Sequence, residues 1–267
     1  MRTPETLGRI GRADRDPPCQ VAEPMSPEHS FELSAFLRAL GLLFSTVFYT
    51  AILCLPAFAS CLLDLSGRWP SFFQRLWVNW ILRTNGIRLK LEGIENLGED
   101  ESYILVSNHA SLLDIPAIIS ASPFPVRFFA KKSLLWLPIF GWFLNFAGHV
   151  LIDRRSARSA LKSQKRASSV LKKGISIIVF PEGTRTPDGE VKKFKRGAFL
   201  LARHSKFPIV PLSISGSFEM LPRTGWCFWP GTIHLRMGEP LATRNLSHQE
   251  SGSLMERVRD TIIKNLK

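Results

Sequence analysis

Residues 103–121 read YILVSNHASLLDIPAIISA, and this stretch decides the fold that we expect. Its first five residues are a short apolar run typical of a buried strand, and residues 112–121 are predominantly apolar and are predicted to be helical. His109 and Asp114 lie between the two. On one continuous helix, five positions would turn these side chains about 140° apart. If His109 instead lies in the turn and Asp114 in the first helical turn, the carboxylate folds back and orients the imidazole through Nδ1.

Short apolar runs alternate with helical stretches from about residue 85 to the end of the chain. This alternation predicts an α/β fold with a mostly buried mixed sheet flanked by helices. The expected strands are residues 87–92, 103–107, 126–130, 149–153, 176–180, 209–215 and 232–238. The expected helices are residues 112–121, 156–173, 196–204 and 249–265.

The N-terminal third has a different composition. Residues 39–63 carry no charge and, as a helix, would extend about 37 Å, enough for a hydrocarbon core of about 30 Å. Pro56 leaves open whether this helix spans the bilayer or bends and stays in one leaflet. Residues 69–83 place Trp and Phe near helical spacing with arginines between them, which suits a helix in the headgroup region or an amphipathic core helix. We therefore predict an N-terminal helical membrane anchor of one or two helices.

We predict three parts: a disordered lead over residues 1–30, the hydrophobic anchor over 31–84 and an α/β domain over 85–267. The lead mixes charges and prolines and has no secretory pattern. Whether Met25 is the true start stays open. A second uncharged run, residues 133–152, is interrupted by prolines and glycines. We expect it to be buried or to contact an apolar ligand rather than to span a membrane.

The positive charge of the chain is concentrated in one region. The chain has 35 Lys and Arg against 22 Asp and Glu, a net charge of +13, and fifteen of the basic residues with only three acids lie between Arg154 and Lys206. This excess predicts an anionic partner. Aromatic residues cluster in apolar runs instead of among the basic residues, so we expect no nucleic acid. We expect neither a metal site nor a disulfide framework from the four cysteines, which are Cys19, Cys54, Cys61 and Cys227.

A second chemical signal follows the apolar strand at 176–180, in the sequence FPEGTR. Gly183 permits a tight turn or the close approach of a ligand, and Arg185 offers a two-pronged guanidinium to a phosphate. Glu182 is expected to hold that arginine or to accept a substrate hydroxyl. Taken alone, these residues are equally compatible with an ordinary turn and an exposed arginine.

Four blocks follow one another along the chain: NHASLLD (108–114), residues 131–155, FPEGTRT (180–186) and IVPLSISG (209–216). In order and spacing they resemble the 1-acylglycerol-3-phosphate acyltransferase family, over about residues 85–240. The resemblance implies that His109 is the catalytic base and Asp114 its partner. It implies substrate binding by Gly148, Asp153, Arg154, Glu182, Gly183, Thr184, Arg185 and Lys195, with Pro211 marking the acyl-donor region.

The resemblance also implies an activity: transfer of a fatty acyl chain from an acyl thioester to the sn-2 hydroxyl of lysophosphatidic acid, giving phosphatidic acid at a phospholipid membrane. The co-substrate is acyl-CoA or acyl carrier protein, with no cofactor and no metal. Ser111 is expected to be a helix cap and not a nucleophile. Another acceptor, glycerol-3-phosphate or a lyso-aminolipid, and a basic lipid-binding module without activity are the alternatives.

Orientation in the membrane is predicted from the arginines. Arg68, Arg75 and Arg83 follow the apolar run closely. By the positive-inside rule they place the catalytic domain on the cytoplasmic face, at the inner membrane if the source is bacterial. Acyl-chain length, the choice between the two donors and the oligomeric state stay open.

Overall fold

The computed structural model describes residues 27–64, 67–98, 101–137, 140–153, 157–224, 226–244 and 248–266. Residues 1–26 and Arg154 lie outside the described residues. The helices are α1 (Pro27–Leu63), α2 (Arg68–Thr84), α3 (Asp114–Ala121), α4 (Phe140–Phe146), α5 (Ala157–Leu171), α6 (Gly197–Ser205), α7 (Ser217–Met220) and α8 (His248–Asn265), with 3₁₀ helices η1 (Ile94–Asn96) and η2 (Lys132–Trp136). The strands are β1 (Arg88–Glu92), β2 (Ile104–Ser107), β3 (Val126–Lys131), β4 (Val150–Ile152), β5 (Ser176–Val179), β6 (Ile209–Ser215) and β7 (Thr232–Met237).

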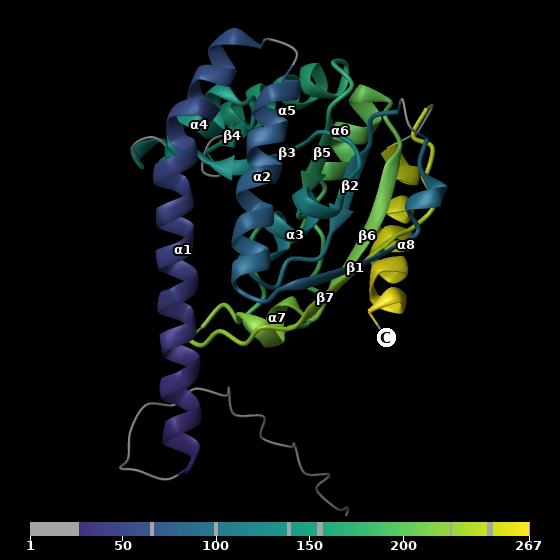
Figure 1. Cartoon of the computed structure of the whole chain (residues 1–267). Helices are drawn as coiled ribbons and strands as arrows, with labels where there is room; N and C mark the ends of the chain where they lie inside the picture. Colours follow the sequence, from purple (N-terminus) through teal and green to yellow (C-terminus); the bar gives the residue numbers. More distant parts are fainter. Residues whose placement is uncertain are drawn as a thin grey trace, which may run out of the picture.

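The described strands form one seven-stranded sheet in the order β1-β7-β6-β2-β5-β3-β4 (Figure 1). Strands β6, β2, β5, β3 and β4 run parallel, whereas β7 is antiparallel to β6 and parallel to β1. All four residues of the central strand β2 are buried. The predicted mixed and mostly buried sheet is therefore confirmed.

Helices cover both faces of the sheet, because successive side chains of a strand point to opposite sides. In β2, Leu105 packs into the core that contains Ile118 of α3, on the face that α2 and α4 also cover. Its neighbours Ile104 and Val106 pack into a second core with Phe199 of α6 and with residues of α5 and α8. The short apolar runs of the sequence are thus buried between two helical layers. Each expected strand is present, and its ends differ from the prediction by at most one residue.

The first two helices form a hairpin. α1 is one continuous helix of 37 residues that includes Pro56, and α2 returns beside it (Figure 1). Two side-chain hydrogen bonds join the helices: Trp77 Nε1 donates to Thr50 Oγ1 at 3.1 Å, and Asn85 Nδ2 donates to Ser45 Oγ at 2.9 Å. α2 also packs against α3, and it buries Val78, Ile81 and Leu82. Both helices therefore belong to the same packed body as the sheet.

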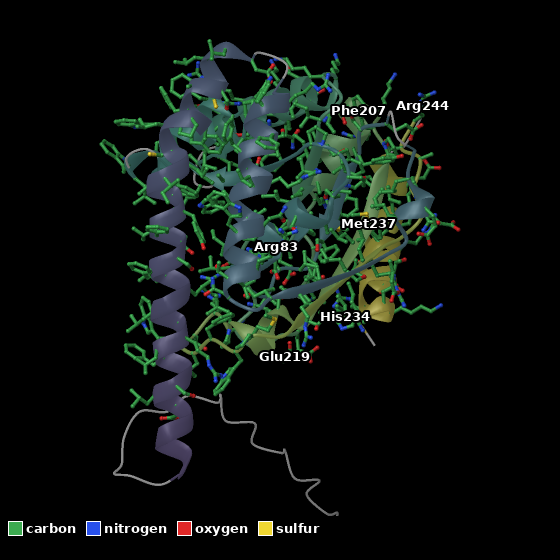
Figure 2. The ribbon with its side chains drawn as sticks, in the orientation of Figure 1. Arg83, Phe207, Glu219, His234, Met237 and Arg244 are labelled. Atoms are coloured by element: carbon green, nitrogen blue, oxygen red, sulfur yellow. The ribbon has the colours of Figure 1, made fainter. Side chains whose placement is uncertain are left out.

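The outer side of α1 is apolar and exposed. In the described part of the chain, α1 is the one helix that is long and apolar enough to cross a membrane, over Glu32–Leu63. Figure 2 shows side chains projecting from it, away from the sheet. Its exposed large apolar side chains are Leu33, Phe36, Leu37, Leu40, Leu43, Phe44, Val47, Phe48, Ile52, Leu55, Leu62 and Leu63. α1 begins four residues before the predicted start of the anchor, and the division into lead, anchor and catalytic domain stays a prediction.

The uncharged run at 133–152 is divided among η2, α4 and β4, so it is no spanning helix. Leu144 is buried, and Leu134 and Phe143 line an apolar cavity, whereas Trp136 and Trp142 are exposed. No disulfide framework was expected from the four cysteines, but Cys227 is disulfide-bonded. Cys54 and Cys61 carry free thiols.

Candidate active site

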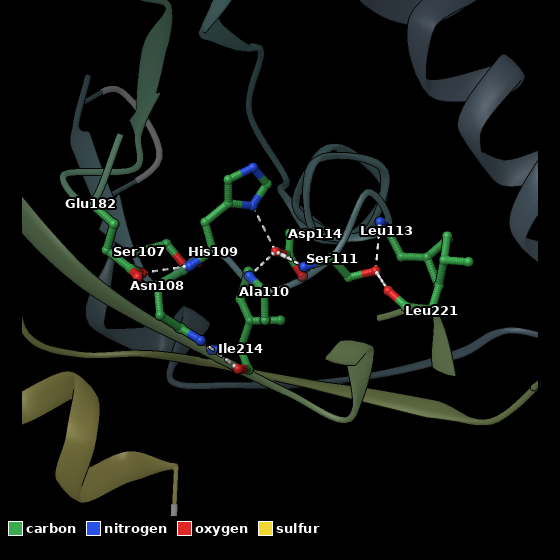
Figure 3. Close-up of polar contacts among 10 residues, drawn as sticks. All are labelled: Ser107, Asn108, His109, Ala110, Ser111, Leu113, Asp114, Glu182, Ile214 and Leu221. Carbon is green, nitrogen blue, oxygen red and sulfur yellow. Dashed lines mark hydrogen bonds and ion pairs between the residues drawn. The ribbon is translucent and has the colours of Figure 1, made fainter. Parts of the chain in front are cut away.

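The turn between β2 and α3 pairs the histidine and the aspartate (Figure 3). His109 Nδ1 lies 2.8 Å from Asp114 Oδ2, and the same oxygen accepts the backbone N–H groups of Ala110 and Ser111 at 2.8 and 2.9 Å. Asp114 is fully buried and is the first residue of α3. The predicted fold-back of the carboxylate is confirmed. Because a carboxylate only accepts hydrogen bonds, Nδ1 carries the proton in the neutral ring and Nε2 is left as a base.

The turn after β5 holds the backbone of His109. The two strands are neighbours, with Val106 opposite Val179, so their ends meet at one edge of the sheet. Glu182 Oε1 accepts the N–H of His109 at 2.9 Å, and Oε2 accepts the N–H of Lys192 at 3.2 Å. Burial raises the pKa of Glu182, while these two hydrogen bonds act in the opposite direction. Glu182 therefore holds backbone groups, and the expected ion pair with the nearby arginine does not form.

Two polar side chains near the histidine connect the His109 turn to β6 and to the loop after α7 by hydrogen bonds. The side-chain amide of Asn108 makes two hydrogen bonds with the backbone of Ile214 in β6. Asn108 Nδ2 donates to the carbonyl of Ile214 at 2.8 Å, and the N–H of Ile214 donates to Asn108 Oδ1 at 2.9 Å. Ser111 Oγ donates to the carbonyl of Leu221 and accepts the N–H of Leu113. The N-cap of α3 is Leu113, without a side-chain cap, so the expectation that Ser111 caps the helix is wrong. The role of Asn108 was not identified from the sequence.

The histidine ring rests on an aromatic residue. His109 stacks on Phe180 with 4.0 Å between ring centroids and 19° between planes. The ring is 15% exposed, and Nε2 points away from the aspartate (Figure 3). Phe180 belongs to the predicted third block but was not singled out there. Its large apolar face fixes the tilt of the imidazole.

Lys195 is brought to the turn that contains Gly183. Gly183 has φ of +79°, a conformation that favours glycine, and a Cβ there would lie 2.9 Å from Lys195 Nζ. The backbone N–H of Lys195 donates to the carbonyl of Pro181 at 2.9 Å, which returns the lysine to this turn. Lys195 and Thr184 are exposed. The structure thus gathers the predicted residues of the third block beside His109, although their contacts with a substrate stay predictions.

Two arginines lie together next to the turn. Arg223 Nη1 donates to the carbonyl oxygen of Arg185 at 2.9 Å. Burial lowers the pKa of Arg185, Arg223 lowers it further, and Asp114 opposes the shift. Arg223 lies on the loop after α7 and was not identified from the sequence.

An apolar cavity of about 710 Å³ opens beside the arginines, between α1, α2, α3, α4 and the loop after α7. Arg185 and Arg223 line one end, next to Leu112 and Leu113. The lining of α1 runs from Ala39 to Ala57, which is about 27 Å along a helix. The remaining walls are mainly Leu, Ile, Phe and Trp side chains. The cavity therefore has the length and polarity that suit a long apolar chain.

The second predicted block lies away from the histidine, and in the fourth it is Ile214 that contacts the His109 turn, through Asn108, and not Pro211. Asp153 follows β4, which is three strands from β2, or about 14 Å at about 4.8 Å per strand. Gly148 precedes β4, with φ of +89°, and faces the Arg127 side chain. Pro211 is buried in β6 where its ladder with β7 ends, and its carbonyl accepts the N–H of Gly238. The structure does not bring these residues to His109, and their predicted substrate roles stay predictions.

Two buried polar side chains were missed by the sequence analysis. Arg127, 1% exposed, donates to the carbonyls of Ala147 and Gly67 and to Ser71 Oγ, and burial lowers its pKa to about 10. His149 lines the cavity, and burial together with nearby arginines holds its pKa well below the usual value. The only sequence signal was a lone arginine within an apolar strand. Among the described residues, no group of three or more His, Cys, Asp or Glu is placed to hold a metal.

Comparisons with known proteins agree with this site. A family model described as Acyltransferase matches residues 88–215, the segment that contains the His–Asp turn, the Glu182 turn and β6. The segment that carries the candidate site therefore matches the acyltransferase class.

The chain is 32% identical over 190 residues to the human 1-acyl-sn-glycerol-3-phosphate acyltransferase alpha, which covers 71% of this chain and 67% of the relative. It is 36% identical over 185 residues to the 1-acyl-sn-glycerol-3-phosphate acyltransferase of Saccharomyces cerevisiae, and this alignment covers 68% of this chain and 61% of the relative. The crystal structure of the 1-acyl-sn-glycerophosphate (LPA) acyltransferase PlsC from Thermotoga maritima matches with a TM-score of 0.75 at 28% identity, covering 88% of this chain and 95% of that one. The chain belongs to the 1-acyl-sn-glycerol-3-phosphate acyltransferase family. It spans about two fifths to two thirds of the length of the curated relatives that it matches.

Proposed function

We propose that the protein is a membrane-bound acyltransferase that moves a fatty acyl chain from an acyl thioester to the sn-2 hydroxyl of lysophosphatidic acid, giving phosphatidic acid. The observation that carries this proposal is the His109–Asp114 pair, held at 2.8 Å, beside the arginines at the end of a long apolar cavity. A base, an anion site and an apolar cavity are the three features that this reaction requires. The family named above supports the same activity.

The reaction starts at Nε2 of His109. The neutral imidazole removes the proton of the sn-2 hydroxyl, and the oxygen attacks the thioester carbonyl. Asp114, bound to Nδ1, stabilises the imidazolium that forms. The tetrahedral intermediate then expels the thiolate, which takes the proton from Nε2. The acceptor hydroxyl is the nucleophile and the thioester is already activated, so the step needs no covalent acyl-enzyme, no cofactor and no metal.

The basic side chains bind the phosphate of the acceptor. Arg185 offers a bidentate guanidinium, and Lys195 lies beside the Gly183 turn. This assignment favours lysophosphatidic acid over acceptors without a phosphate. The donor is acyl-CoA or acyl carrier protein, both of which are anionic and suit the basic region.

The cavity holds an acyl chain. Its lining along α1 extends about 27 Å, longer than one leaflet of a hydrocarbon core of about 30 Å. Apolar surface buried there contributes about 25 cal/mol per Å². Binding of the acyl chain there would place the reacting carbonyl near Leu112 and Leu113, which lie between His109 and Asp114 in the sequence.

The protein acts at a membrane surface, with its catalytic domain on the cytoplasmic face. The exposed apolar side of α1, together with exposed Trp69 and Trp136, supports this location, because aromatic and apolar side chains favour the bilayer boundary. The arginines that follow α1 in the sequence support the orientation.

The proposal is tested by one matrix of acceptors and donors. Purified protein in phospholipid micelles is offered lysophosphatidic acid, glycerol-3-phosphate, a lyso-aminolipid or a neutral monoacylglycerol, each with acyl-CoA and with acyl carrier protein. We expect product with lysophosphatidic acid and one of the donors. Because a base contributes about 10²–10⁴-fold, His109→Ala should lower kcat at least about 100-fold.

The matched control is His234→Ala, which removes an exposed histidine of β7 (Figure 2) and should leave kcat unchanged. Transfer to glycerol-3-phosphate alone would replace the proposed acceptor. Absence of turnover with every pair, by a folded protein that still binds lipid, would instead support the lipid-binding module. A trapped acyl-serine would contradict direct transfer.

A further inference from the structure

The loop after α7 places a second guanidinium at the end of the cavity. Arg223 donates to the carbonyl of Arg185, and both side chains line the same cavity. Two like charges repel, and here the partial burial of Arg185 adds to that cost. Such an arrangement is stabilised when an anion binds between the two groups.

No acidic side chain in the described part of the chain forms an ion pair with these two arginines, although the charge of Asp114 partly offsets the effect of Arg223 on the pKa of Arg185. The carboxylate of Glu182 is used by the backbone N–H groups of His109 and Lys192. Asp114 is buried, and one of its oxygens takes three hydrogen bonds within its own turn. Neither Arg185 nor Arg223 forms an ion pair with any residue that the structure describes.

We propose that Arg223 is a second phosphate-binding residue, which holds the phosphate of the acceptor together with Arg185. The inference rests on the proposed function, because it takes the acceptor to be a lysophospholipid with a terminal phosphate. Arg223 binds the acceptor and has no part in the proton transfer. Two guanidiniums on one phosphate give more hydrogen bonds than Arg185 alone and select a doubly charged headgroup.

The position of the pair favours the acceptor phosphate over the phosphates of the donor. Arg185 and Arg223 line the cavity together with Leu112 and Leu113, which lie between His109 and α3 in the chain. In lysophosphatidic acid the phosphate is on the carbon next to the one that carries the reacting hydroxyl. In CoA the phosphates are separated from the thioester by the long pantetheine arm. A phosphate at this end of the cavity is therefore the one joined to the nucleophile.

The test measures binding without turnover. The probe is 1-acyl-2-deoxyglycerol-3-phosphate, which has the phosphate but no sn-2 hydroxyl, and the reference ligand is the same molecule without the phosphate. Titration calorimetry in detergent micelles gives Kd for both ligands. Because a hydrogen bond to a charged group contributes enough to change an equilibrium about 10- to 100-fold, we expect Arg223→Gln to raise Kd for the phosphate probe by that factor. Kd for the reference ligand should not change.

The control variant is Arg257→Gln, which removes one exposed arginine of α8 and should leave both Kd values unchanged. Arg223→Lys should retain part of the affinity. Arg185→Gln combined with Arg223→Gln should weaken binding by a factor different from the product of the two single effects, because the two residues share one ligand.

Two results would overturn the inference: an equal loss of affinity for both ligands, or no loss of affinity for the phosphate probe. Because no donor is present in the titration, the result can be read even if the wild-type protein transfers no acyl chain. Failure of the proposed function and failure of this inference are thereby distinguished.

Discussion

At the scale of single residues, three donors converge on one oxygen of Asp114. Asp114→Asn keeps an oxygen for them but removes the negative charge that stabilises the imidazolium of His109. The other carboxylate oxygen, Oδ1, has no hydrogen-bond partner. The amide nitrogen of the asparagine can take its place without breaking a hydrogen bond. We predict that kcat falls about 10²–10⁴-fold in steady-state assays while Tm changes little. A variant with wild-type kcat would show that the pair is structural.

Glu182 provides a pH-dependent prediction. Its pKa is raised by burial, so the folded state binds a proton more tightly than the unfolded state does. Stability from this group is therefore present at low pH and is lost as pH rises above the ordinary value of 4.5 toward the raised pKa. Glu182→Gln does not titrate, and its single oxygen accepts only one of the two backbone N–H groups.

We predict that the difference in Tm between wild type and Glu182→Gln is largest below pH 4.5 and shrinks as pH rises through the raised pKa of Glu182. Thermal unfolding in detergent at a series of pH values checks this. A difference that grows with pH would mean that the folded state favours the ionised carboxylate. We also expect kcat of the variant to fall, because Glu182 positions the backbone of His109.

At the scale of elements, Arg127 joins three of them. From β3 it reaches Ser71 in the first turn of α2 and the carbonyl of Ala147 after α4. Arg127→Met leaves these buried partners without a hydrogen bond, at about 1–3 kcal/mol for each buried group. We predict a fall in Tm of several degrees, measured by thermal unfolding, and loosening of α2 in hydrogen exchange. Arg83→Met, at an exposed site on α2, is the control and should unfold like the wild type.

At the scale of the whole molecule, α1 and the sheet domain together enclose the cavity. The loop after α7 contacts α1 at Ala35, next to the first lining residue Ala39, and Ala57 is the last lining residue of α1. Ala57→Trp fills that end, so long acyl chains lose space while short chains keep theirs. We predict that kcat/KM for the longest donors falls at least about tenfold and that the shortest donors are little affected, in assays with a series of chain lengths. An equal loss of kcat/KM for all chain lengths would show that the acyl chain does not bind at the Ala57 end of the cavity.

The outer side of α1 supports a prediction about membrane binding. Phe44 and Leu55 are 70% and 78% exposed and do not line the cavity. Each contributes about 1.5–3 kcal/mol when it enters an apolar phase. We predict that changing both to Glu lowers sedimentation with anionic phospholipid vesicles at least tenfold. Arg257→Glu on α8, which adds charge on the opposite side of the sheet, should reduce it much less.

Much of the secondary structure and the first half of the site were predictable from the sequence. Strands and helices follow from apolar periodicity, which acts over a few residues, so the β2 strand and the helix that follows it were placed to within two residues. The His109–Asp114 contact spans five residues and forms within one turn, so it was predicted as well. Ser111 was expected to cap the helix, but α3 begins only at Asp114, so the Ser111 oxygen accepts the N–H of Leu113 in the turn before it.

The sequence by itself determined the strand and helix segments, the His–Asp turn and the location of the basic region. Only the tertiary structure decided which distant residues complete the site. Glu182 reaches His109 across 73 positions, and Arg223 reaches Arg185 across 38. These contacts depend on the order of strands in the sheet, which places β5 beside β2, and on the path of the loop after α7. Strand order depends on the packing of the whole core, and local periodicity carries no information about it.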